Sequence, residues 1–248
     1  MSVSTSVSLT TMRLPKSIVS TTLAALCLVG VSACSSEADT PSPSQSTEIS
    51  PAQRLAGAKA KADAATSFHL TLTSADVPDG ADGIVSAEGV GQHPPAFKGT
   101  FKVRLRGIEA DAEVISLNGE VYAKLPLIPG MNKIDPKTFG LPDPAMLFST
   151  DKGLTTLLTA TSNPTKGQPV RLGSEVLSTI SGTVPGANVV DLLGIGDRNG
   201  TFAATYGLTD DGQLRQVVLK GPFFGAGTAA TYTLVLDKYG EPVTIEKP

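Results

Sequence analysis

The 248-residue sequence contains no tryptophan, two cysteines and two histidines. So few Cys and His exclude a Cys/His-rich zinc module and a disulfide scaffold. Charged residues make up 17% of the chain, below the roughly 25% of an average soluble domain. Aromatic residues are only 5%, whereas hydrophobic residues reach 40% and 25 residues are glycine. We therefore expect a core built from Val, Leu, Ile and Ala with a few Phe.

Neither charge nor motifs point to nucleic acid or to catalysis. The 20 Lys and Arg against 23 Asp and Glu give a net charge of −3, without the basic excess of nucleic-acid binders. The sequence has no G-x-S-x-G elbow, H-E-x-x-H motif or Walker A loop. His69 and His93 are interpreted as surface or capping residues, and Ser149 with Lys152 matches S-x-x-K without the accompanying S-D-N or K-T-G. We expect no enzyme, no metal and no cofactor.

Residues 1–33 are predicted to be a signal peptide. Arg13 and Lys16 precede an uncharged, mostly apolar run over 18–33, which at ~1.5 Å per residue is too short for the ~30 Å hydrocarbon core. Val31-Ser32-Ala33-Cys34 looks like a bacterial lipobox, which implies cleavage before Cys34 and a diacylglycerol on its sulfur. The alternative is a plain secretory peptide with an incidental cysteine.

The segment that follows is predicted to be a disordered tether. Residues 35–50 (SSEADTPSPSQSTEIS) are rich in Ser, Thr and Pro and nearly free of large apolar side chains, so they cannot bury enough surface to offset the entropy of ordering. With Cys34, the tether spans residues 34–50. A lipidated cysteine followed by a polar tether is typical of a domain held at a membrane surface.

Residues 51–248 are predicted to form a single α+β domain. Ser50 and Pro51 favour a helix start, and the Ala-rich segment indicates a helix over 51–66. Alternation of apolar and polar residues from Phe68 onward indicates strands, and Asn118-Gly119 favours a hairpin. We expect about nine or ten antiparallel strands and four helices. The strands come from eleven candidate segments: 68–73, 84–91, 101–106, 108–114, 120–125, 168–172, 175–184, 201–208, 213–220, 231–237 and 243–245. Short helices are predicted near 144–148, 154–158 and 187–193, and a loop over 126–144.

Small residues recur on the face of the sheet predicted to point inward, at Ala110, Ala112, Ala123, Gly182 and Ala204. A large sheet, small inward side chains and short covering helices can leave an apolar cavity, which usually holds a ligand. The alternative is that small residues simply let the helices pack closely. The residues alone leave both interpretations open.

Several segments, in order along the domain, resemble the mycobacterial and actinobacterial LppX/LprA/LprF/LprG lipoprotein family. They are Ser67–Leu72, Gly99–Leu105, Ala112–Ala123, Asp151–Leu158, Ile180–Val184 and Tyr239–Pro248. The resemblance implies a curved antiparallel sheet, like a half-barrel, covered on its concave face by short helices, with a large hydrophobic cavity. It also implies carriage of multi-acyl lipids or glycolipids, such as triacylglycerol, acylated mannosides or wax-like lipids, across the cell envelope. One departure is the Pro-rich loop Pro126–Pro144, where the family typically has a Trp- or Tyr-bearing segment.

The candidate site is the lining of this cavity. Strand alternation and the predicted helices give the lining residues as Leu70, Phe101, Val103, Leu105, Ala112, Val114, Leu154, Leu157, Leu158, Ile180 and Phe202. The predicted partners are an acylated lipid or glycolipid, the membrane through the lipid on Cys34, and an envelope transporter. The domain is expected to be a monomer on the outer face of the cell membrane. A scaffold lipoprotein that binds a protein instead of a lipid, and a hydrolase without a recognisable motif, are the alternatives.

Overall fold

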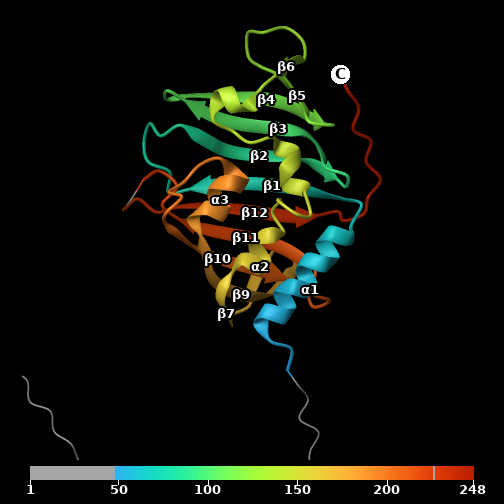
Figure 1. The fold of residues 1–248 in the computed structure, drawn as a ribbon, viewed down its shortest axis with the longest axis vertical. Coiled ribbons are helices and arrows are strands. Elements are labelled where there is room, and N and C mark those ends of the chain that lie inside the picture. Colours follow the sequence, from blue (N-terminus) through green and yellow to red (C-terminus); the bar gives the residue numbers. More distant parts are fainter. Residues whose placement is uncertain (1–47, 226) are drawn as a thin grey trace, which may run out of the picture. The chain divides into compact units, whose positions relative to one another are not determined.

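The computed structural model describes residues 48–225 and 227–248, so the predicted signal peptide, Cys34 and most of the tether lie outside the described residues. Twelve antiparallel strands form one sheet in the order β6-β5-β4-β3-β2-β1-β12-β11-β10-β9-β7, with β8 paired to β9 (Figure 1). The two ends of this order do not pair, so the sheet stays open. This confirms the predicted α+β class with an antiparallel sheet.

The elements have the following bounds. The strands are β1 (Ser67–Ala75), β2 (Gly83–Gln92), β3 (Ala96–Leu105), β4 (Ile108–Leu117), β5 (Glu120–Lys124), β6 (Asn132–Ile134), β7 (Ser162–Lys166), β8 (Val170–Leu172), β9 (Glu175–Pro185), β10 (Thr201–Leu208), β11 (Leu214–Gly221) and β12 (Ala230–Asp237). The helices are α1 (Pro51–Ala64), α2 (Thr156–Ala160) and α3 (Gly186–Leu193), with the 3₁₀ helices η1 (Pro136–Phe139) and η2 (Pro144–Phe148).

Helix α1 begins where its capping residues predict. The Ser50 hydroxyl accepts from the backbone N–H of Gln53, and the Gln53 side chain accepts from the Ser50 N–H, which forms a capping box. Pro51 at the first helical position adds a pre-set φ angle. The helix ends at Ala64 rather than at residue 66, and Leu55, Ala58 and Ala62 form its buried side.

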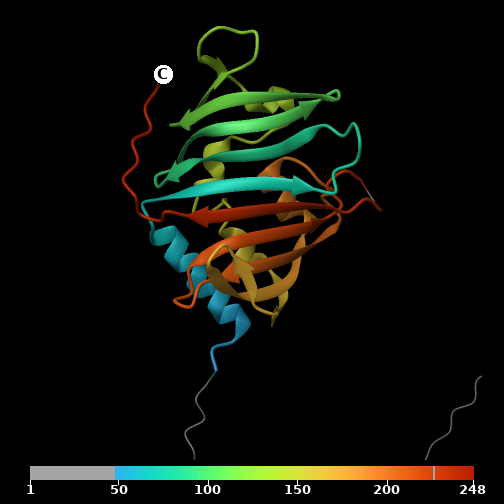
Figure 2. The ribbon, with the colours of Figure 1, turned by 180° about the vertical axis from the view of Figure 1, so that it is seen from behind.

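The helices lie on one face of the sheet, which we call the inner face. Figure 1 shows α1, α2 and α3 in front of the strands, and Figure 2 shows the outer face with the strands in front and the helices behind them. Along β1, Phe68, Leu70 and Leu72 are buried on the inner face and alternate with His69 and Thr71 on the outer face. The period of two in the sequence therefore places the apolar residues under the helices.

Three details of the sequence-based prediction are wrong. The predicted loop over 126–144 contains β6 and η1. Strand β7 was not predicted, because Pro164 and its polar neighbours resemble a loop; a proline is tolerated there because β7 is an edge strand. Residues 243–245 form no strand.

The C-terminal segment lies on the outer face instead. Ile245 is buried in a small cluster with Ala96 and Ile115, and Lys247 forms an ion pair with Glu120 of β5. Hydrogen bonds from Lys133 and Lys247 lower the pKa of Glu120 to about 2. The alternation of Val243 and Ile245 that predicted a strand thus reflects apolar packing on the sheet without a ladder of backbone hydrogen bonds.

Glycines on the inner face make room for aromatic rings. A Cβ atom on Gly91 of β2 would lie 2.1 Å from the ring of Phe148 in η2. A Cβ on Gly99 of β3 would lie 2.6 Å from the ring of Phe97. The rings of Phe97 and Phe148 are themselves stacked, with centroids 6.0 Å apart. The small residues at these positions therefore allow close packing.

We predict that Gly91→Ala destabilises the fold by about 1–3 kcal/mol, because the added methyl group and the Phe148 ring cannot occupy the same space. Gly57→Ala is the matched control, since a Cβ there meets no atom within 4 Å and alanine stabilises an exposed helix position by about 0.5–1 kcal/mol. Urea unfolding of both variants measures the difference. Equal stability of Gly91→Ala and the parent would mean that η2 does not pack against β2 in this way.

Candidate functional site

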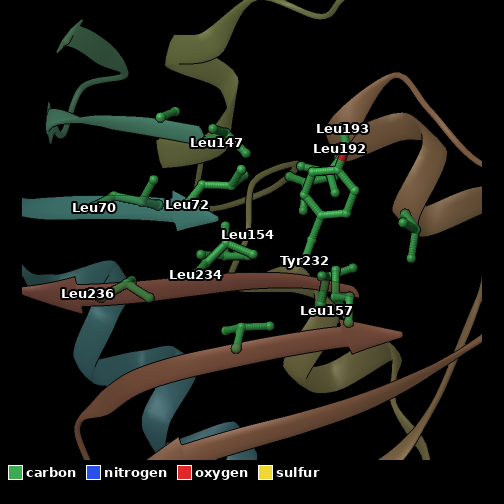
Figure 3. Packing of buried hydrophobic residues seen from close by; sticks show 14 of the residues in the cluster. Leu70, Leu72, Leu147, Leu154, Leu157, Leu192, Leu193, Tyr232, Leu234 and Leu236 are labelled. Atoms are coloured by element: carbon green, nitrogen blue, oxygen red, sulfur yellow. The ribbon is translucent and has the colours of Figure 1, made fainter. Parts of the chain in front are cut away.

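The interior between the sheet and the helices is apolar and uncharged. It is built from the inner faces of β1, β12 and β11 on one side and from η2, α2 and α3 on the other (Figure 3). Figure 3 labels Leu70 and Leu72, Tyr232, Leu234 and Leu236 from the sheet, and Leu147, Leu154, Leu157, Leu192 and Leu193 from the opposite layer. Among the described residues, the buried polar side chains are Ser67, Ser116, Thr155 and Thr179, none of them ionisable in the physiological range.

Two buried tyrosines keep their hydroxyls paired within this interior. The Tyr206 hydroxyl lies 2.8 Å from Thr161 Oγ1 and donates to the Leu157 carbonyl at 3.1 Å. The Tyr232 hydroxyl donates to the Ile84 carbonyl at 3.0 Å. Burial raises the pKa of each phenol to about 12. Both side chains therefore stay neutral at physiological pH, and they offer no free polar group to a ligand.

The predicted lining residues fall into three groups. Eight are buried and belong to one core cluster: Leu70, Ala112, Val114, Leu154, Leu157, Leu158, Ile180 and Phe202. Phe101 and Val103 are partly buried and pack against that cluster. Leu105 follows the inward alternation of β3 but is 46% exposed. It pairs with Ile108 in the last rung of the β3–β4 hairpin, at the margin of the sheet.

Part of the interior is closely packed. A side chain that lines a water-sized cavity keeps some accessible surface, whereas Leu154, Leu157, Ile180 and Phe202 have none. The space that small inward residues leave is occupied by rings: Phe148 lies over Gly91, and a ring atom of Phe202 lies 2.4 Å from the position of a Cβ on Gly221. At these positions the structure shows close packing, one of the two interpretations that the sequence left open.

The apolar interior reaches solvent along β3 and β4. Phe101 and Val103 are half-buried, Leu105 is 46% exposed and Ile108 is 71% exposed, and we call these four residues the β3–β4 strip. All four follow the inward alternation of their strands. Ile108 was missed as a site residue, although its alternation with Ala110 and Ala112 was visible in the sequence. The strip is a route by which an apolar group could approach the core.

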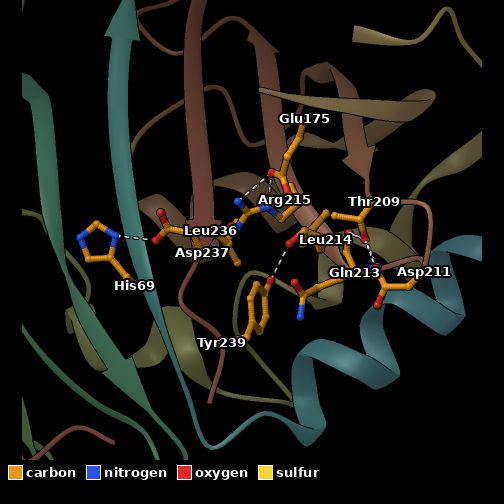
Figure 4. Close-up of polar contacts among 10 residues, drawn as sticks. All are labelled: His69, Glu175, Thr209, Asp211, Gln213, Leu214, Arg215, Leu236, Asp237 and Tyr239. Carbon is orange, nitrogen blue, oxygen red and sulfur yellow. Dashed lines mark hydrogen bonds and ion pairs between the residues drawn. The ribbon is translucent and has the colours of Figure 1, made fainter. Parts of the chain in front are cut away.

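Polar side chains gather on other parts of the domain and make structural contacts (Figure 4). On the outer face, His69 Nδ1 lies 2.8 Å from Asp237 and its Nε2 lies 3.2 Å from Glu88. Arg215 binds Glu175 at 2.8 Å and the Leu236 carbonyl at 2.6 Å. Within residues 48–225 and 227–248, no cluster of three or more His, Cys, Asp or Glu has the arrangement of a metal site. The same residues include no helix of the length and hydrophobicity that a bilayer span requires.

Comparison with known proteins identifies the family. Residues 50–245 match the model of the LppX_LprAFG lipoprotein family. The chain belongs to this family. Two solved members share its fold: LprF from Mycobacterium bovis (19% identity, TM-score 0.67, 80% of this chain and 96% of that one) and LppX from Mycobacterium tuberculosis (18% identity, TM-score 0.56, 79% and 98%). A comparison with curated proteins gives no match.

Membership in the LppX/LprAFG family agrees with the resemblance that the sequence motifs indicated. The structural likeness covers nearly the whole length of both solved proteins. At these identities it establishes the fold, an open antiparallel sheet with its helices on one side. The family is one of lipoproteins.

We predict that this LppX/LprAFG protein loses stability as the pH rises above about 10. The unfolded chain releases its phenol protons near pH 10, whereas Tyr206 and Tyr232 hold theirs up to about 12 in the folded state. The free energy of unfolding should therefore fall by up to about 1.4 kcal/mol per pH unit for each buried phenol. Tyr206→Phe removes one of these phenols and should make the decline shallower, at a cost of about 1 kcal/mol at neutral pH. Urea unfolding from about pH 8 to about pH 12 measures both slopes, and equal slopes would contradict the assignment of Tyr206.

Proposed function

We propose that the protein binds the acyl chains of a multi-acyl lipid or glycolipid between its sheet and its helices and carries that lipid across the cell envelope. The observation that carries the proposal is an uncharged aliphatic interior that continues into the exposed β3–β4 strip. Each CH₂ group left in water costs about 0.8 kcal/mol, so a lipid with two or three long chains needs such a shelter to cross an aqueous space. Binding of this kind needs no polar anchor and no catalytic group. We therefore propose that the protein is a carrier and not an enzyme.

Loading requires the helix layer to move away from the sheet. The strands are joined by continuous backbone ladders, whereas α2 has five residues, α3 has eight and η2 is a five-residue 3₁₀ helix. Helices this short have little stability of their own and depend on packing. Withdrawal of Phe148 from Gly91 would open apolar space on β2 beside the β3–β4 strip. The predicted lining residues would then contact the ligand.

The proposed place of action follows from the N-terminal sequence. Cleavage before Cys34 and lipidation of its sulfur would hold the domain on the outer face of the cell membrane through a tether over residues 34–50. The domain would act as a monomer that receives its lipid there, with an envelope transporter as a candidate partner. A second candidate function is a scaffold lipoprotein without a lipid ligand, which the close packing around Leu154, Leu157 and Phe202 favours.

The test compares tryptophan substitutions on the two faces of the sheet. We predict that Val103→Trp, within the β3–β4 strip, blocks lipid loading while the fold stays intact, because Val103 is only partly buried. Val90→Trp is the matched control, since Val90 is also partly buried but lies on the outer face of the neighbouring strand β2. Native mass spectrometry of each protein from a mycolate-making host shows whether a lipid mass is bound.

The outcomes separate the two candidate functions. A di- or triacylated lipid on the parent and on Val90→Trp, but absent from Val103→Trp, supports the carrier. Equal lipid on all three proteins would remove the strip from the binding site. A bare protein mass for the parent, repeated after incubation with extracted envelope lipids, would overturn the carrier proposal in favour of the scaffold.

A further inference from the structure

The loop between β5 and β6 presents two large aliphatic side chains to water. Leu127 is fully exposed, with 103% of its reference surface accessible, and Ile128 is 48% exposed. Figures 1 and 2 show this loop standing out beyond the edge of the sheet. Leu125, at the base of the loop, packs against the core. The loop is therefore fixed at its base and apolar at its tip.

The backbone of the loop tip is also unusual for a leucine. The Ile128 N–H donates to the Leu125 carbonyl at 3.3 Å, which closes a turn with Pro126 and Leu127 at its centre. Leu127 has a φ of 66°, the left-handed conformation that this turn position normally fills with Gly or Asn. The chain thus holds a large aliphatic residue in a strained conformation and in full contact with water. Both costs would be absent with Gly or Asn, so the Leu side chain itself requires an explanation.

We propose that the β5–β6 loop inserts Leu127 and Ile128 into an anionic phospholipid surface. A protein partner is the poorer fit, because a stable protein interface buries about 800 Å² on each partner and its energetic centres are enriched in Trp, Tyr and Arg. Residues 125–131 (LPLIPGM) contain none of these three residue types. Two aliphatic side chains on a protruding turn form a small patch that a bilayer can surround from every side. This inference does not depend on the proposed lipid cargo.

The loop itself carries no carboxylate that would oppose an anionic surface. Residues 125–134 contain no acidic residue and one lysine, Lys133, although the chain as a whole has a net charge of −3. Two of the carboxylates next to the loop are paired with lysines: Glu113 pairs with Lys124 at 3.0 Å, and Glu120 pairs with Lys133 at 2.7 Å. The third, Asp135, follows β6, is exposed, and accepts from the Lys137 backbone N–H at 3.0 Å. The tip can therefore approach negative headgroups without a repelling carboxylate of its own.

The loop lies far from the point where the chain enters the domain. Figures 1 and 2 show the start of α1 and the β5–β6 loop at opposite ends of the sheet order, beside β7 and β6 respectively. A chain held at a membrane through residues before α1 would thus have its apolar loop at the other end of the domain. In that orientation the loop is free to meet a second lipid surface.

The absence of tryptophan from the sequence allows a site-specific test. The chain from residue 47 onward forms one compact unit, and Leu127→Trp places a single indole at the loop tip. Val176→Trp is the matched control, because Val176 of β9 is 52% exposed and lies toward the opposite edge of the sheet. With vesicles of phosphatidylglycerol and phosphatidylcholine, we expect the emission of Leu127→Trp to shift to shorter wavelength and that of Val176→Trp to stay unchanged. No shift in Leu127→Trp, or the same shift in both, would overturn the proposal.

A second variant separates loss of binding from loss of folding. Leu127→Asn with Ile128→Asn removes both aliphatic side chains and places at residue 127 a residue type that tolerates positive φ, so its thermal midpoint should equal or exceed that of the parent. Co-sedimentation with the anionic vesicles should weaken at least about tenfold, since full burial of each side chain contributes about 1.5–3 kcal/mol. Unchanged co-sedimentation would overturn insertion of these residues. Equal binding of the parent to vesicles of phosphatidylcholine alone would overturn the requirement for an anionic surface.

Discussion

The structure depends on covering the apolar inner face of a twelve-stranded sheet with only a few short helices. Burial of that face is the main source of stability, because the outer face is largely polar and carries ion pairs such as Lys102–Asp111 that contribute little. The helix layer packs tightly over the strands from β2 through β12 to β9. Along the β3–β4 strip the cover is incomplete. The helices thus cover only part of the inner face. The covered part is closely packed, and the β3–β4 strip stays exposed.

The sheet and the helices pack closely at glycine positions on the inner face. Where a glycine replaces a larger residue on the sheet, a ring from elsewhere in the chain fills the space, as Phe148 does over Gly91. The contact is apolar and non-directional, so an acyl chain can replace the ring at small net cost in buried area. A core held by hydrogen bonds or ion pairs would not permit such an exchange without leaving polar groups unpaired. The neutrality of the interior therefore matters as much as its hydrophobicity.

The sequence predicted local structure better than it predicted the interior. Alternation at Phe68, Leu70 and Leu72 and the Asn118-Gly119 hairpin are local signals, and the strands formed as expected. Strand β7 carries no such signal, since its pairing with β9 depends on a neighbour that lies more than ten residues away. Whether Gly91 faces a cavity or the ring of Phe148 depends on a contact across 57 residues. Alternation shows which residues share a face, but not what packs against that face.

In the loop over 126–144, too, the sequence predicted the local features but not those that depend on contacts with other strands. Its prolines indicated a surface segment, and the tip is exposed, but its short strand β6 is set by pairing with β5. The positive φ of Leu127 was likewise invisible in the sequence, since the neighbouring Pro126 fixes only its own backbone angle. In the proposed carrier the aliphatic interior would contact the acyl chains, so selection of a lipid by its headgroup would come from the surface. The β5–β6 loop at the sheet edge is a place where such selection could arise without disturbing the core.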